Sequence, residues 1–128
     1  LNILLIIDYE QGIVQSGQVF ISGSIGLVPG SMVLVSDSEA AQAGLALRHV
    51  SRVTEVVTSH RVTLASASRV TCYVTSEEAA RQAQHVWLSH EETDKGLRVR
   101  YVLVSQLPRG AKVEWELELK SVIDNQDD

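Results

Sequence analysis

Apolar and polar residues alternate most clearly near the C-terminus of this chain. In segment 113–119 every second residue is apolar, and the residues between them are Glu114, Glu116 and Glu118. Alternation of period two is typical of a strand with one buried face. Segment 68–75 alternates in the same way, and it predicts a strand whose buried face is made of Val70, Cys72 and Val74.

The stretch from Val99 to Leu119 predicts two strands joined by a tight turn at Leu107-Pro108-Arg109-Gly110, with the last strand as the hairpin partner of the one before it. Near the other end of the chain, two short apolar runs around Gly17 predict a second hairpin, formed by residues 12–15 and 19–23. The apolar run Leu1–Ile7 and the segment 32–35 predict short strands or extended segments.

Two segments carry the signals of amphipathic helices. Ser36-Asp37-Ser38-Glu39 has the pattern of a capping box. In a capping box the Ser36 hydroxyl accepts a hydrogen bond from the backbone N–H three residues on, and the Glu39 side chain accepts one from the backbone N–H of Ser36. The helix that follows should run to about Val57, with an apolar stripe of Ala43, Ala46, Val50, Val53 and Val57. Thr75-Ser76-Glu77-Glu78 begins a second helix that should run to about Leu88, with a stripe of Ala79, Ala83, Val86 and Trp87.

Each helix has a single apolar stripe to bury, so both should lie on one face of a mixed sheet. We therefore predict an α+β fold. The 128 residues form one domain, with a core over about 9–120 and an acidic tail over 121–128. The chain begins with Leu1 rather than Met, which suggests a piece of a longer polypeptide.

Charge and cysteine content narrow the setting of the protein. The formal net charge is −5, which disfavours binding to the phosphate backbone of nucleic acids. Cys72 is the only cysteine, so no intrachain disulfide can form, and a reducing, cytoplasmic location is expected. The apolar run at the start is too short to cross a bilayer and lacks the flanks of a signal peptide, so no membrane partner is expected.

Few side chains in the sequence suggest chemistry. The row formed by Glu114, Glu116 and Glu118 could supply a general base, or it could be a solvated strand face. Cys72, on an apolar face, has the pattern of a core residue. The four histidines have no zinc-ligand spacing, so no metal is expected. No other cofactor is expected either.

Arg98 and Arg100 place two cations beside a largely apolar row that includes Val102 and Val104. One of them could bind an anionic ligand or a neighbouring subunit. Alternatively, both could be charges that keep an edge strand from pairing with other chains.

Two motifs carry a family resemblance. Gly17-Gln18-Val19-Phe20-Ile21-Ser22-Gly23 and Leu107-Pro108-Arg109-Gly110-Ala111-Lys112-Val113-Glu114-Trp115-Glu116 resemble the RidA family, also called YjgF or endoribonuclease L-PSP. The resemblance spans about residues 9–119 and includes Tyr9-Glu10-Gln11.

This resemblance implies a chorismate-mutase-like fold and a homotrimer with clefts between subunits. Active members of the family hydrolyse enamines and imines such as 2-aminoacrylate to 2-keto acids. It implies a ligand site for a small carboxylate lined by Tyr9, Gly23 and Glu114, with Glu114 as the catalytic carboxylate. The arginine that clamps the substrate carboxylate in the family falls at Val99, between Arg98 and Arg100, so we predict that the clamp is missing. The family often has Asn at the position of His49.

A narrower resemblance is to the RidA-like domains fused behind the ATP-pyrophosphatase domain of eukaryotic diphthine–ammonia ligases. It rests on Ile25-Gly26-Leu27-Val28-Pro29-Gly30-Ser31-Met32 and Ala46-Leu47-Arg48-His49-Val50. It implies an accessory binding or assembly module that contacts the ligase domain, with ATP used only in that domain. The alternatives are an enamine/imine deaminase that uses Arg98 or Arg100, and a ribonuclease, which the charge of −5 and the lack of a histidine pair disfavour.

Overall fold

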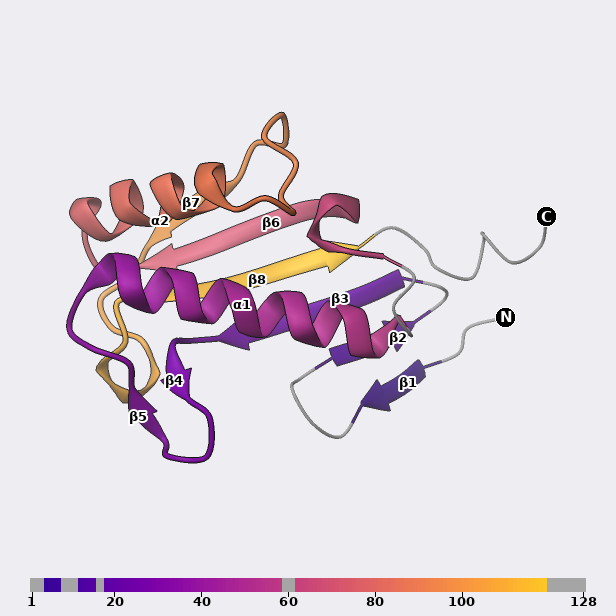
Figure 1. The fold of residues 1–128 in the computed structure, drawn as a ribbon, viewed down its shortest axis with the longest axis horizontal. Helices are drawn as coiled ribbons and strands as arrows, with labels where there is room; N and C mark the ends of the chain where they lie inside the picture. The colour runs from indigo at the N-terminus through magenta and orange to yellow at the C-terminus, as the bar shows by residue number, and fades with distance from the viewer. Residues whose placement is uncertain (1–3, 8–11, 16–17, 59–61, 120–128) are drawn as a thin grey trace.

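The computed structural model describes residues 4–7, 12–15, 18–58 and 62–119. Short strands come first, and a long helix, a strand, a shorter helix and two further strands follow (Figure 1). The elements in chain order are β1 (Leu4–Ile7), β2 (Gly12–Gln15), β3 (Gln18–Ser24), β4 (Leu27–Val28), β5 (Val33–Leu34), α1 (Glu39–Val57), η1 (Leu64–Ser66), β6 (Ala67–Val74), α2 (Glu77–Ser89), β7 (Arg100–Leu103), η2 (Pro108–Gly110) and β8 (Val113–Leu119).

The main sheet has the strand order β1-β2-β3-β8-β6-β7. All neighbours in it are antiparallel except β6 and β7, which are parallel. The predicted hairpin of β2 and β3 is confirmed by their antiparallel pairing. The predicted pairing of the last two strands is wrong, because β6 lies between β7 and β8. The strand that leaves α2 pairs in parallel with β6, and the chain then returns through η2 to fill the centre of the sheet.

Helix α1 covers residues 39–57, as its apolar stripe predicts, but Ser38 rather than Ser36 is its N-cap. The Ser38 hydroxyl accepts the backbone N–H of Ala41 at 3.1 Å. Ser36 instead accepts the N–H of Ser38, and its carbonyl accepts a hydrogen bond of 2.7 Å from the Gln42 side chain. These two contacts hold Ser36 outside the helix, so the predicted capping box does not form.

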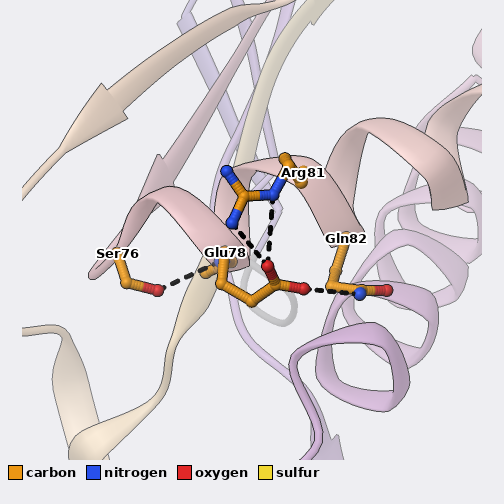
Figure 2. A network of polar contacts seen from close by, with 5 residues as sticks. Ser76, Glu78, Arg81 and Gln82 are labelled. Atoms are coloured by element: carbon orange, nitrogen blue, oxygen red, sulfur yellow. Dashed lines mark hydrogen bonds and ion pairs between the residues drawn. The ribbon is translucent and has the colours of Figure 1, made fainter.

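Helix α2 begins at the predicted signal. The Ser76 hydroxyl accepts the N–H of Ala79 at 3.0 Å, which satisfies one free donor of the first turn (Figure 2). On the exposed side of this turn, Glu78 accepts hydrogen bonds from Arg81 and Gln82 (Figure 2). Figure 2 therefore shows a network that stabilises the start of α2, and every contact in it comes from the helix or its cap.

Both helices lie on the same face of the sheet, as predicted (Figure 1). The side of β8 that faces them contributes Val113, Trp115, Leu117 and Leu119, each at most 3% exposed. Trp115 donates its indole N–H to the Ala43 carbonyl of α1 at 3.1 Å, and its ring lies 5.6 Å from that of Trp87 in α2. Trp115 thus ties the central strand to both helices. Within the described part of the chain, no helix is both long and apolar enough to span a bilayer.

Candidate functional site

The sheet face opposite the helices carries the candidate chemistry. Strand register sets which side chains share this face: Thr71 lies beside Glu116 on one side and Arg100 on the other. Tyr73 lies beside Glu114 and Val102 in the same way. We call this surface the open face; it consists of Phe20, Arg69, Thr71, Tyr73, Arg100, Val102, Glu114, Glu116 and Glu118.

A shallow hollow of about 280 Å³ lies on the open face between β3, β8 and β6. The side chains that project into it come from Phe20, Arg69, Thr71, Glu116 and Glu118. It therefore combines one aromatic ring, one cation and two carboxylates. A hollow of this size and shape is too shallow to bury most of the surface of a ligand by itself.

A side-chain hydrogen bond between Tyr73 and Glu116 crosses this face. The Tyr73 hydroxyl donates to Glu116 Oε1 at 3.2 Å, although the two residues are 43 positions apart. Burial and then the charge of Glu116 raise the pKa of Tyr73, while the cation of Arg100 acts in the opposite direction. Arg100 is therefore close enough to the tyrosine ring to influence it.

Glu114 lies next to this pair and is half-buried. Burial, followed by the charge of Glu116, raises the pKa of Glu114 above its ordinary value. A raised pKa makes a carboxyl a better candidate for proton transfer than an ordinary surface carboxylate. The three glutamates of β8 share one face, as predicted, and all are half-buried rather than fully solvated.

Val99 and its two arginine neighbours differ in their surroundings. Val99 is partly buried and packs against the hydrophobic core, on the helix side of the sheet. Arg100 is exposed on the open face, in register with Thr71, and no register shift interrupts the pairing of β7 with β6. Arg98 is exposed just before β7 begins. The structure thus brings Arg100 to the face that carries Glu114 and directs Val99 away from it.

Of the two remaining predicted ligand residues, the structure describes only Gly23. Gly23 is in β3, where the register with β8 shifts between Ile21 and Ser24. A shift of this kind marks a β-bulge, which frees backbone groups from the ladder. Tyr9 lies outside the described residues.

Tyr73, Thr71 and Arg69 were not predicted as site residues. The alternation of β6 already placed them opposite Cys72, so the pattern contained the signal for their face. The local pattern could not show which strand lies beside β6. That neighbour is β8, which is far along the chain.

Cys72 lies on the core face and is fully buried. Burial, with a smaller contribution from the charge of Glu114, raises the pKa of its thiol, which disfavours the nucleophilic thiolate. The predicted core placement is confirmed. Among residues 4–7, 12–15, 18–58 and 62–119, no group of three or more His, Cys, Asp or Glu side chains could hold a metal ion.

Comparison with known proteins identifies the family. The family model described as endoribonuclease L-PSP matches residues 2–118. The diphthine–ammonia ligase of Schizosaccharomyces pombe is 37% identical over 112 residues, which is 85% of this chain and 17% of the relative. The ligase of Saccharomyces cerevisiae is 33% identical over 109 residues, which is 75% of this chain and 15% of the relative. The chain thus spans about a sixth of the length of the curated relatives that it matches.

Solved structures agree with this match. The RidA protein of the Antarctic bacterium Psychrobacter sp. has a TM-score of 0.75 at 22% identity, over 91% of this chain and 90% of that one. This likeness concerns the fold, and it confirms the predicted chorismate-mutase-like α+β architecture. Because the family model covers nearly all of a chain with this fold, the chain belongs to the endoribonuclease L-PSP family, which is also called the RidA or YjgF family.

Proposed function

We propose that this chain is an accessory domain of a diphthine–ammonia ligase, in the cytoplasm, where it assembles into a homotrimer and binds a small carboxylate ligand between subunits. The observation that carries the proposal is its likeness to the ligases over most of its own length and only a small part of theirs. In such a protein ATP is used in a separate catalytic domain, and the RidA-like domain contacts that domain.

The open face supports the assembly. The helices cover only the other face, so the hollow beside Phe20 is open to one side. Glu114, Glu116 and Glu118 are already half-buried in a single subunit. Further copies packed on this face would close the hollow into a cleft, and Arg69 and Arg100 supply cations that offset the row of carboxylates.

The placement of Val99 supports ligand binding without turnover. Its side chain packs on the core, which supports the prediction that the carboxylate clamp implied by the family resemblance is missing at this position. Arg100 can attract a carboxylate to the open face, but it lies one position along the strand, and successive strand residues face opposite sides. We therefore expect an anion held by Arg100 to lie away from the position at which the resemblance places the clamp.

The second candidate is an enamine/imine deaminase, and the joint placement of Arg100, Tyr73 and Glu114 on one face favours it. In that reaction the enamine gains a proton at C3 to become an imine. Water then adds to C2 and ammonia leaves, which gives the 2-keto acid. Arg100 would hold the carboxylate, and Glu114, with its raised pKa, would move the proton.

Two measurements test these proposals. Light scattering after size exclusion should give the mass of a trimer of the 14.0 kDa chain, and a clean monomer would rule out the assembly. Keto-acid release from freshly generated 2-aminoacrylate should stay at the uncatalysed rate. Turnover that is lost in Arg100→Ala and in Glu114→Ala, but retained in the control Arg81→Ala on α2, would establish the deaminase and defeat the binding-module proposal.

A further inference from the structure

A second hollow lies on the other side of the molecule, away from the open face. It is a groove of about 840 Å³ between α1 and the hairpin of β4 and β5. In Figure 1 this hairpin lies at the lower left, beside the first half of α1. The Nε2 atom of His49 in α1 lies 2.7 Å from the Leu27 carbonyl oxygen of the hairpin. This hydrogen bond joins the two walls of the groove.

The helix wall of the groove is a second stripe along α1, separate from its core stripe. It runs from Leu45 through Arg48 and Arg52 to Val56, at spacings of three and four. Both guanidinium groups are exposed, and neither makes a hydrogen bond or ion pair among the residues that the structure describes. In a chain of net charge −5, two unpaired cations one turn apart form a local positive site.

The other wall is apolar. Val28 is 39% exposed and Met32 is 57% exposed, and Val56 at the far end of the helix stripe is 43% exposed. Met32 has a positive φ of 62° at the tip of the hairpin. Solvent-exposed apolar side chains that share one groove with two cations are typical of a surface that recognises a partner.

We propose that this groove, which we call the α1 groove, docks an acidic amphipathic helix of a partner protein. Two carboxylates one turn apart on that helix would pair with Arg48 and Arg52, and its apolar side chains would cover Val28, Met32 and Val56. The proposal is independent of the open face and of the function proposed above.

The shape and charge of the groove favour this occupant. From Leu45 to Val56 the helix wall spans about 16 Å, roughly three turns, which matches the length of a short docked helix. A small anion would engage the two guanidinium groups and leave the apolar wall in water. A nucleic acid needs a longer row of cations than these two, on a less acidic protein.

The test uses a fluorescein-labelled 15-residue helical peptide of alanine, leucine and glutamate, with glutamates four residues apart and leucines beside them. Fluorescence anisotropy should show that it binds the protein and that binding weakens as salt is raised. The same peptide with lysine at each glutamate position should not bind. The double variant Arg48→Glu/Arg52→Glu should lose at least about tenfold in affinity, while the control Arg81→Glu on α2 should bind like the wild type.

Thermal unfolding checks that the double variant is folded, and Arg48→Gln/Arg52→Gln replaces it if it is not. Three results would overturn the proposal. The first is no binding of the glutamate peptide up to about 1 mM, or equal binding by the double variant. The second is displacement of the peptide by an equal concentration of inorganic phosphate, which would assign a small-anion site. The third is a change of oligomeric state in the double variant, which would assign the groove to contacts between copies.

Discussion

Gly26 lies directly against the backbone of Gln42. A Cβ atom at Gly26 would be 2.8 Å from the Gln42 carbonyl oxygen and 2.9 Å from its Cα, closer than real Cβ atoms approach. Gln42 itself is 1% exposed, and its side chain accepts the N–H of Lys112 at 2.8 Å. The glycine therefore lets the segment that leads into the β4–β5 hairpin rest directly on the backbone of α1.

We expect Gly26→Ala to lower the free energy of unfolding by about 2 kcal/mol. The new methyl group would clash with backbone atoms of Gln42, which cannot move aside as a flexible side chain could. The matched control is Gly44→Ala, within α1, where a Cβ meets nothing within 4 Å. Alanine there should raise stability by up to about 1 kcal/mol, through helix propensity. Urea unfolding measures both. A Gly26→Ala protein as stable as the wild type would mean that the hairpin does not rest on α1 as described.

The N-cap of α1 gives a second prediction, which separates two serines. Ser38→Ala should lower the free energy of unfolding by about 1 kcal/mol, because the N–H of Ala41 loses its acceptor. Ser36→Ala should cost a few tenths of that, since Ser36 makes an exposed contact outside the helix. Chemical denaturation of the two variants tests the assignment, and a larger loss from Ser36→Ala would reverse it.

The two tryptophans give a third prediction. Trp115 Nε1 donates to the Ala43 carbonyl, whereas Trp87 Nε1 is buried and has no hydrogen-bond partner in the part of the chain that the structure describes. Both changes to phenylalanine remove apolar surface from the core, but only Trp115→Phe also removes a hydrogen bond. It should therefore lower the free energy of unfolding by about 1 kcal/mol more than Trp87→Phe. Equal losses in urea unfolding would show that the bond to Ala43 contributes nothing.

Local periodicity explains which parts of the fold could be predicted. The alternation of β8 and the helical stripes of α1 and α2 depend on neighbours in sequence, so their faces are visible in the sequence. The partner of β7 is not visible there. A strand followed by a tight turn has the same local sequence pattern whether or not it pairs with the strand after the turn. Long-range pairing decided it: β6 bonds β7 on one edge and β8 on the other.

The same distinction applies to the candidate site. Alternation placed Glu114 and Glu116 on one face, and placed Arg100 and Val102 together on β7. The bond from Tyr73 to Glu116 requires the register between two distant strands, which no local pattern specifies. The cap of α1 was mispredicted for a related reason: Ser36 and Ser38 are both good caps, and the side chain of Gln42, which holds the Ser36 carbonyl, decided between them.

The raised pKa of Glu114 leads to the last prediction, the pH dependence of stability. Burial and the charge of Glu116 raise the pKa of this carboxyl above 4.5, so the folded protein holds the proton more tightly than the unfolded chain does. Its contribution to stability is therefore complete below pH 4.5 and is lost as the pH rises through the higher folded pKa. Glu114→Gln cannot ionise, so it should be more stable than the wild type at neutral pH, and this advantage should shrink towards pH 4.5.

Glu78 supplies a control of opposite sign. Hydrogen bonds from Gln82 and then Arg81, together with the charge of Arg81, lower the pKa of Glu78 below 4.5, so its contribution is present above that pH and fades as the pH falls. Glu78→Gln should be slightly less stable than the wild type at neutral pH, by little, because water and salt screen this exposed group. Unfolding midpoints of both variants, measured as differences from the wild type across the pH series, should diverge in opposite directions as the pH rises from 4.5. If the stability differences of the two variants changed with pH in the same direction, the pKa of Glu114 would not be raised in the folded protein. Its proposed role in proton transfer would then lose its physical basis.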